Sequence, residues 1–144
     1  MKSIIVYYSK TQNTESVVKR FDIQAKMIKA QSEDPNQKHI VLLEKPDIRN
    51  LDHIIFACPV HGFQACRIMK AYLESLDDLR GKTIDLFVTH HFRFAWLGGI
   101  QALKQMRQII HKKNGVVRHE RSINWKSHKR ESDIEEMIQL FQKE

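Results

Sequence analysis

Short apolar runs alternate with amphipathic stretches along the chain. The apolar runs are typical of strands in a parallel sheet, because such strands are covered on both faces and need few polar side chains. We expect five strands, at residues 3–8, 39–43, 53–57, 83–88 and from residue 116 onward. Asp85 is charged and interrupts the fourth run, so we expect it to lie near an edge or an end of the sheet.

Apolar residues that recur at helical spacing fill most of the intervals between these strands. We expect four helices, with apolar faces at Val17, Val18, Phe21, Ala25 and Ile28, and within residues 68–76, 100–110 and 134–141. The dipeptide Asn114-Gly115 is a typical C-terminal signal for the third helix. Residues 132–135, Ser-Asp-Ile-Glu, have the form of a capping box that opens the fourth helix.

The order of these elements is β-α-β-loop-β-α-β-α-β-α, which predicts a single α/β domain over residues 1–144. The expected fold class is a doubly wound three-layer sandwich, in which helices cover both faces of a parallel sheet. Ligands of such folds bind beyond the carboxyl ends of the strands, where the winding direction reverses. Three segments follow those ends, residues 9–14, 58–66 and 89–99, and each has an unusual composition.

The first segment consists almost entirely of hydrogen-bonding side chains and holds Ser9, Lys10, Thr11, Gln12, Asn13 and Thr14. A helical pattern begins directly after it, and a helix N-terminus offers free backbone N–H groups and a partial positive charge that suit a phosphate. The alternative is a helix cap without a ligand, since Ser, Thr and Asn are preferred capping residues and one would suffice. The segment lacks the Walker and G-x-G-x-x-G spacings, which argues against nucleoside triphosphates and NAD.

The other two segments are rich in aromatic and histidine side chains, which suit a flat aromatic cofactor. The second contributes Pro59, Val60, His61, Gly62 and Phe63, and the third contributes Thr89, His90, His91, Phe92, Phe94, Trp96, Gly98 and Gly99. Two of the ring-bearing residues of the third segment are expected to anchor it in the core instead. Gly62 tolerates a positive φ and permits a peptide to rearrange, and Gly98-Gly99 allows close backbone approach.

The same segments hold residue types that zinc or iron accepts as ligands, namely Cys58, His61, Cys66, His90 and His91. The spacing Cys-x2-His-x4-Cys does not match a usual zinc motif, and Cys58 belongs to the end of a strand. Neither cysteine has an activating partner in the sequence, so a catalytic thiol is not expected. Two cysteines are too few for a disulfide framework, and reduced thiols are the expectation.

The formal net charge of +7 is concentrated in one segment. Residues 101–130 contain nine Lys or Arg and a single acid, Glu120, while the rest of the chain is close to neutral. This segment is either a solvated basic face or a surface that attracts an acidic partner, anionic lipid or nucleic acid. No nucleic-acid motif accompanies it, so nucleic acid is the weakest of these candidate partners.

No apolar run reaches the roughly 20 residues of a membrane span and no leader peptide is evident, so we expect a cytoplasmic protein.

The first segment resembles the phosphate-binding loop of flavodoxins, whose usual form is hydroxyl-x-Thr-Gly-x-hydroxyl. It matches at Ser9, Thr11 and Thr14 and differs at Gln12, where the family has glycine. The resemblance continues through DHIIFACPVHGF (52–63), RGKTIDLFVT (80–89), LGGIQALKQM (97–106) and INWKSHKRESDIEEMI (123–138), and so covers nearly the whole chain.

The resemblance implies a five-stranded parallel sheet in the order 2-1-3-4-5, with FMN at its switch point. The phosphate would sit on residues 9–14 and the isoalloxazine ring between residues 59–63 and 89–99. In flavodoxins a backbone carbonyl of the second segment turns toward the flavin on reduction, a movement that Gly62 permits. The third segment differs from the common acidic, glycine-rich form, and its two histidines and Arg93 would favour the fully reduced flavin.

Two classes of function are consistent with these residues. The first is FMN-dependent electron transfer between redox partners or reduction of a small quinone-like substrate, including NAD(P)H-dependent quinone or flavin reduction. The second is a degenerate flavodoxin fold that no longer binds FMN and serves as an interaction module, because Gln12 in a left-handed backbone conformation would cost roughly 1–3 kcal/mol. Flavodoxins are typically acidic, so the basic charge of this chain implies a redox partner with an acidic docking face.

Overall fold

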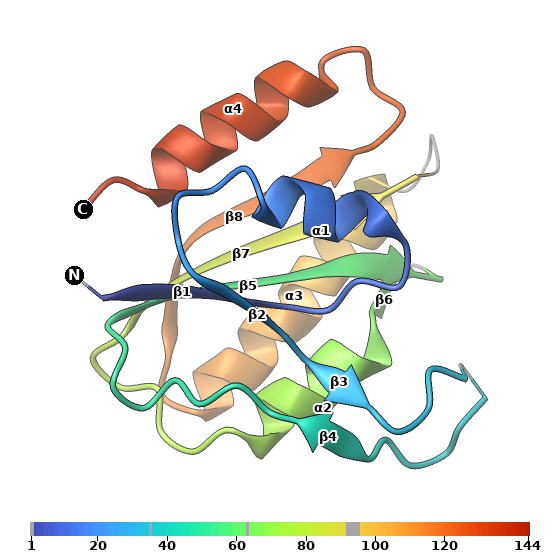
Figure 1. Cartoon of the computed structure of the whole chain (residues 1–144), viewed down its shortest axis with the longest axis vertical. Coiled ribbons are helices and arrows are strands. Elements are labelled where there is room, and N and C mark those ends of the chain that lie inside the picture. Colours follow the sequence, from blue (N-terminus) through green and yellow to red (C-terminus); the bar gives the residue numbers. More distant parts are fainter. Residues whose placement is uncertain (1, 35, 63, 92–95) are drawn as a thin grey trace.

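A parallel sheet of five strands forms the centre of the protein in the computed structural model, which describes residues 2–34, 36–62, 64–91 and 96–144 (Figure 1). The strands are β1 (Ser3–Tyr7), β2 (Ala25–Met27), β5 (His53–His61), β7 (Thr83–His90) and β8 (Val116–Asn124). They lie in the order β2-β1-β5-β7-β8, and each pairs in parallel with its neighbour. Counted along the chain, this is the order 2-1-3-4-5, so the expected α/β fold class is confirmed.

Helices cover both faces of the sheet (Figure 1). They are α1 (Gln12–Val18) and α4 (Arg130–Phe141) on one face, and α2 (Arg67–Ser75) and α3 (Trp96–Lys112) on the other. The first face packs around Phe21, Phe87 and Phe141, and the centroids of the stacked Phe21 and Phe87 rings are 6.0 Å apart. The second packs around Phe56 and Tyr72, whose ring centroids are 6.3 Å apart. Burial on both faces explains why β1, β5 and β7 are largely apolar without alternation.

The first helix is shorter than the apolar spacing predicts. The prediction of one continuous helix as far as Ile28 is wrong, because residues 25–27 form β2. The Ile5 N–H donates to the Gln24 carbonyl at 2.9 Å, and the Ile28 N–H donates to the Tyr7 carbonyl at 2.8 Å. This segment therefore completes the backbone hydrogen bonding of β1, and that pairing outweighs a weak local helical preference.

The expected second strand at residues 39–43 is also wrong. The chain there forms a short antiparallel pair, β3 (Lys29–Ala30) with β4 (Leu42–Glu44), in a separate two-stranded sheet. Val41 and Leu43 are 49% and 65% exposed, so the apolar run does not mark a buried strand. Figure 1 shows the pair beside α2, at the margin of the molecule.

Asp85 lies near the amino end of β7, as expected, yet it is fully buried in an interior strand. Two basic side chains hold its carboxylate. His53 Nε2 lies 2.7 Å from Oδ2, and Arg118 donates to Oδ1 and Oδ2 at 3.2 and 2.7 Å. Arg118 also donates to the carbonyl groups of Phe141 and Lys143, at 3.0 and 2.8 Å. The buried carboxylate therefore fastens the end of α4 to the sheet.

The sequence predicts a signal at the C-terminal end of α3 and another at the N-terminal end of α4, and only the first is confirmed. Asn114 has a φ of 66° and the Gly115 N–H donates to the Ile110 carbonyl at 2.9 Å, so the expected C-terminal signal is confirmed. A Cβ on Gly115 would lie 2.6 Å from Ile110 Cγ2, so space requires glycine there. The expected capping box at residues 132–135 is wrong, because α4 begins before it and its N-cap, Lys129, makes no side-chain cap bond.

None of the helices in the described part of the chain combines the length and apolar character of a membrane span.

Replacing Asp85 with asparagine is expected to destabilise the fold by about 3 kcal/mol near neutral pH, because Arg118 and His53 lose the buried charge that they face. Burial alone would raise the pKa of Asp85, but the hydrogen bonds from His53 and Arg118 outweigh it and hold this pKa below its ordinary value. The carboxylate therefore stabilises the fold above the unfolded-state pKa of about 3.9, and this contribution is lost as the pH falls through the folded-state pKa. Urea unfolding at a series of pH values should show the difference between the two proteins shrink on acidification.

Glu44→Gln is the control for this measurement, because Glu44 forms an exposed ion pair with Lys29 at 3.6 Å. Its loss should change the free energy of unfolding by less than about 1 kcal/mol. A difference for Asp85→Asn that stayed constant with pH would contradict the role of the buried carboxylate.

Candidate functional site

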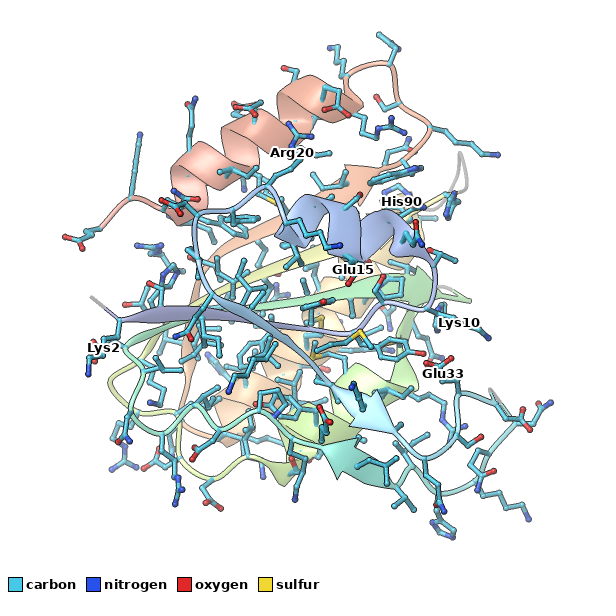
Figure 2. All side chains as sticks on the ribbon, viewed as in Figure 1. Lys2, Lys10, Glu15, Arg20, Glu33 and His90 are labelled. Carbon is cyan, nitrogen blue, oxygen red and sulfur yellow. The ribbon has the colours of Figure 1, made fainter. Side chains whose placement is uncertain are left out.

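The carboxyl ends of β1, β5 and β7 meet at one end of the sheet. Pro59 of β5 pairs with Thr89 of β7, so these strands run side by side to the same depth. Figure 2 shows Lys10 and His90 at this end and Lys2 at the opposite end. The three segments that the sequence analysis singled out therefore gather at one place.

The segment after β1 is built around the start of α1. Thr11 is the N-cap residue and makes no side-chain cap hydrogen bond. Ser9 Oγ donates to the Thr11 carbonyl and accepts from the Glu15 N–H at 3.3 Å. The Glu15 carboxylate accepts in turn from the Tyr7 hydroxyl at 3.1 Å, and Lys10 is exposed beside them. Hydroxyl groups and a helix start without a side-chain cap thus lie together, an arrangement that suits a phosphate.

Gln12 stands where the resembled loop has glycine. It is the first residue of α1, and among the described non-glycine residues only Asn114 has a positive φ. The Gln12 side chain is exposed. The replacement of glycine therefore introduces no backbone strain at this position.

Two side-chain contacts join the start of α1 to the segment after β7. The hydroxyl groups of Thr14 and Thr89 are 2.8 Å apart and buried. Asn13 Nδ2 and His91 Nε2 are 2.6 Å apart at the surface. These contacts hold the two segments at a defined distance, and the Thr14 hydroxyl is used inside the protein rather than toward an open site.

The segment after β5 is a hairpin rather than an open loop. β5 continues through Pro59 and Val60, and β6 (Gln64–Ala65) folds back to pair with it. Gly62 turns the chain with a φ of 54°, a left-handed conformation that favours glycine. The predicted backbone freedom at Gly62 therefore coincides with the tip of a tight turn.

The hairpin is held from the side of α3. The Ala65 N–H donates to the Gln105 side chain at 3.1 Å.

Burial, followed by the positive charge of Lys10, lowers the pKa of His61 below its ordinary value. The imidazole of His61 is therefore neutral near pH 7, and it brings no positive charge to the site.

The segment after β7 is anchored on β8. His90 is buried, and its carbonyl accepts from the Trp125 N–H at 2.8 Å. Gly99 of α3 lies so close to β8 that a Cβ would clash with the Ser122 hydroxyl. The expected close approach at the glycine pair thus occurs at Gly99, inside the helix rather than before it.

Several of the expected ring-contacting residues have no described geometry. Phe63, Phe92 and Phe94 lie outside the described residues, as does Arg93. Trp96 is the first residue of α3, and its side chain is likewise outside the description. Their contact with a flavin remains a prediction from the sequence.

Cys58 and Cys66 are fully buried in the α2–α3 core, and neither forms a disulfide. A hydrogen bond with Cys66 and burial raise the pKa of the Cys58 thiol, and its Sγ lies 3.9 Å from Met106 Sδ. Among the described residues, no group of three or more His, Cys, Asp or Glu side chains is placed to hold a metal ion. The cysteines therefore behave as small apolar core residues, which supports neither the metal nor the catalytic-thiol alternative.

Sequence reasoning did not single out Tyr8 or Ser122. Tyr8 is buried directly after β1, and burial together with a hydrogen bond to Glu33 raises the pKa of its hydroxyl. Ser122 Oγ is buried and has no hydrogen-bond partner within the described part of the chain. Only the parallel register of β7 with β8, which pairs Val88 with Ser122, brings the serine here, so no local signal could have found it.

Comparisons with solved structures agree with this architecture. A protein described as a flavoprotein from Bacteroides uniformis ATCC 8492 superposes with a TM-score of 0.71 at 21% identity, over 96% of this chain and 97% of its own. The chain has a flavodoxin-like fold. A flavoprotein from Lactobacillus acidophilus NCFM in complex with FMN gives a TM-score of 0.64 at 16% identity, over 94% of this chain and 97% of its own.

An NADH:FMN oxidoreductase in its apo form shares the same fold. It gives a TM-score of 0.63 at 17% identity, over 98% of this chain and 88% of its own. No family model matches the chain, and the search of curated proteins found no match. At these sequence identities the similarity shows the fold alone, so the function has to be argued from the site.

Gly99→Ala is expected to lower the stability of the protein by about 1–3 kcal/mol, because the added methyl group overpacks the contact between α3 and β8. Urea unfolding measures this loss. Ser122→Gly removes the atoms that the methyl group would meet, so the double variant should be more stable than the sum of the two single effects.

Gly62→Ala is the control for this cycle. Nothing lies within 4 Å of a Cβ on Gly62, so its cost comes from the positive φ alone. Ser122→Gly should therefore leave the effect of Gly62→Ala unchanged. Simple additivity of Gly99→Ala and Ser122→Gly would show that the two residues are not in tight contact.

Proposed function

We propose that the chain binds FMN at the carboxyl end of the sheet and uses it in electron transfer or in the reduction of a small quinone-like substrate. One observation carries the proposal. The hydroxyl-rich start of α1 is joined through Thr14–Thr89 and Asn13–His91 to the segment after β7, so the expected phosphate donors and one expected ring-flanking segment lie side by side. The FMN complex and the FMN oxidoreductase among the proteins of similar fold support it.

The residues present fit the phosphate of FMN. The hydroxyl groups of Ser9 and Thr11 lie at the start of α1, Thr11 makes no side-chain cap bond, and Lys10 supplies a positive charge. Donors without an arginine are sufficient, because a helix start adds free N–H groups and a favourable dipole. When bound, FMN would supply the ability to accept and release one or two electrons.

The hairpin and the segment after β7 would hold the ring of the flavin. Gly62 is exposed, has a left-handed φ of 54° and has nothing within 4 Å of a Cβ position, so its peptide has room to turn. The neutral imidazole of His61 can donate or accept one hydrogen bond at the ring edge without adding charge. These residues would orient the ring.

The alternative is an interaction module that has lost FMN. Its main support was the strain expected at Gln12, and the ordinary backbone of Gln12 removes that support. The alternative therefore rests on the basic charge of the chain and on the sequence difference alone.

Titration with FMN is expected to quench the flavin fluorescence as the purified, flavin-free protein binds it. The variant Ser9→Ala/Thr11→Val should bind FMN at least about a hundredfold more weakly, because hydrogen bonds to a charged group contribute about 1.5–3 kcal/mol each. Riboflavin lacks the phosphate, so its affinity should be the same for the variant and the parent protein.

Ser75→Ala is the control, since the Ser75 hydroxyl donates to the Tyr72 carbonyl within α2, away from the site. Absence of quenching by FMN would sink the proposal and favour the interaction module. If FMN binds, turnover of a quinone with NADH or NADPH identifies a reductase. Reversible electron exchange without such turnover identifies a carrier.

Within the basic 101–130 segment, the residues nearest this site follow β8. Trp125 is bonded to His90, and Lys126 and Lys129 are exposed directly after it. Other basic residues of the segment are neutralised within the fold, as Arg118 is by Asp85 and Arg107 is by Glu120 at 2.6 Å. As a proposal, the redox partner of the chain carries an acidic docking face that meets the exposed lysines.

Electron transfer from the reduced, FMN-loaded protein to ferricyanide, an anionic acceptor, is expected to slow as salt is added, because salt screens the attraction. Lys126→Gln/Lys129→Gln should lower the rate at low salt about twofold or more. Lys2→Gln/Lys143→Gln is the matched control near the chain termini, at the opposite end of the sheet (Figure 1). A stopped-flow rate that is independent of salt would contradict electrostatic steering at this surface.

A further inference from the structure

A hollow of about 430 Å³ lies at the same end of the sheet, on the side of α2. It is enclosed by residues 32–34, by the β5–β6 hairpin and by the first turn of α2. Figure 2 places Lys10 and Glu33, two of its lining residues, near one another beyond the end of β1. None of the described residues of the 89–99 segment lines it, so the hollow lies apart from the space between the two segments that are expected to hold the flavin ring.

The floor of the hollow is apolar and belongs to the core. Tyr8, Ala65 and Ile68 line it, and all three are buried members of the α2–α3 core. Ile40 lines the same space and is half-buried. The surface that faces the hollow is mostly apolar, and its volume falls within the roughly 300–1,000 Å³ typical of small-molecule sites. The floor therefore suits a flat apolar ring system and offers it no charged group.

The charged groups around the hollow stand at its rim and balance one another. Its described lining includes two positive and two negative side chains, namely Lys10, Arg67, Glu33 and Asp34. Three of them are exposed and Arg67 is half-buried, so they border the hollow without forming its floor. His61 adds no charge near pH 7, because burial and the nearby Lys10 lower its pKa. A charged ligand would give up water and find no unmatched opposite charge, which costs free energy. The balance of the rim therefore favours an uncharged ligand.

Neutral hydrogen-bonding atoms lie at the same rim. Ser32 Oγ accepts from the Asp34 N–H at 3.1 Å, and a hydroxyl group that accepts in this way can still donate its own proton. The neutral imidazole of His61 has one donor and one acceptor nitrogen. A carbonyl or amide group of a ligand can therefore be hydrogen bonded here without a charge. Arg67 is not needed for this, and its guanidinium donates to the Lys38 carbonyl at 3.1 Å.

We propose that this hollow binds an uncharged aromatic molecule of about two fused rings that carries a carbonyl group. The ring system lies against the floor formed by Tyr8, Ala65 and Ile68, and the carbonyl group meets the neutral hydrogen-bonding atoms of the rim. The hollow shares the β5–β6 hairpin with the proposed FMN site, so a molecule bound in it lies beside that hairpin. It is a second site, and binding there requires no flavin.

Titration of the flavin-free protein with three naphthalene compounds tests the proposal, with the methyl NMR signals of Ala65 and Ile68 as the readout. Neutral 2-naphthamide should shift both signals, while those of Leu79, which precedes β7 at the opposite end of the sheet, should stay in place. Anionic 2-naphthoate and cationic 2-naphthylmethylammonium should each bind at least about fivefold more weakly, because neither finds an unmatched opposite charge. This comparison uses the parent protein, so it does not depend on any variant folding correctly.

Two kinds of variant separate the floor from the rim. Ile40→Trp should weaken the binding of 2-naphthamide at least about tenfold, because the larger side chain fills the hollow. Val41→Trp is the matched control and should bind like the parent protein, since Val41 is 49% exposed and is not among the described lining residues. Asp34→Asn leaves the rim with an excess of positive charge, so it should bind 2-naphthoate about threefold more tightly and 2-naphthamide as the parent does.

Three results would each overturn the proposal. They are absence of 2-naphthamide binding, equal or tighter binding of either charged compound by the parent protein, and binding that leaves the Ala65 and Ile68 signals unshifted. The measurement uses no FMN, so its failure leaves the proposed flavin site untouched, and failure of FMN to bind leaves this proposal standing.

Discussion

The parallel pairing of β1, β5 and β7 is the constraint on which the rest of the structure depends. Ser3 pairs with His53, and His53 pairs with Thr83, so the three strands begin at one level and deliver the segments that follow them to one end. Both faces of these strands are buried against helices, so a slip of one residue would exchange the side chains of the two cores. The strand register therefore brings the segments of the proposed site together. Contacts such as the Thr14–Thr89 hydrogen bond then hold two of these segments against each other.

The two ends of the sheet use polar residues in opposite ways. At the amino end, Asp85 is buried with His53 and Arg118, and its hydrogen bonds are closed within the fold. A buried carboxylate is tolerated only with such partners, and here the partner Arg118 also holds the last turn of the chain. At the carboxyl end, Thr11 at the start of α1 and Lys10 are exposed to solvent. This asymmetry places a buried, stabilising polar cluster at one end and the proposed ligand site at the other.

Strands covered on both faces were predictable, whereas the region between β1 and β5 was not. Continuous apolar runs identified β1, β5 and β7, because burial on two faces leaves little room for polar residues. Ile28 has helical spacing from Val17 and Val18, yet it follows a strand, since the edge of β1 needed a hydrogen-bonding partner. Val41 and Leu43 resemble a strand core but are largely exposed. The local sequence pattern cannot show which strand edge lacks a hydrogen-bonding partner. Here the free edge of β1 determined that residues 25–27 form a strand.

The sequence by itself determined the layered α/β fold, the position of the hydroxyl-rich segment at residues 9–14 and the backbone freedom at Gly62, because burial and backbone conformation act on neighbouring residues. The tertiary structure alone decided that Gln12 is unstrained, that Ser122 faces Gly99, and that Lys10 and Arg67 share a hollow with Tyr8. The last two of these relations join residues far apart in the chain. They depend on strand register and helix packing, which arise from the balance of the whole core and leave no trace in local spacing.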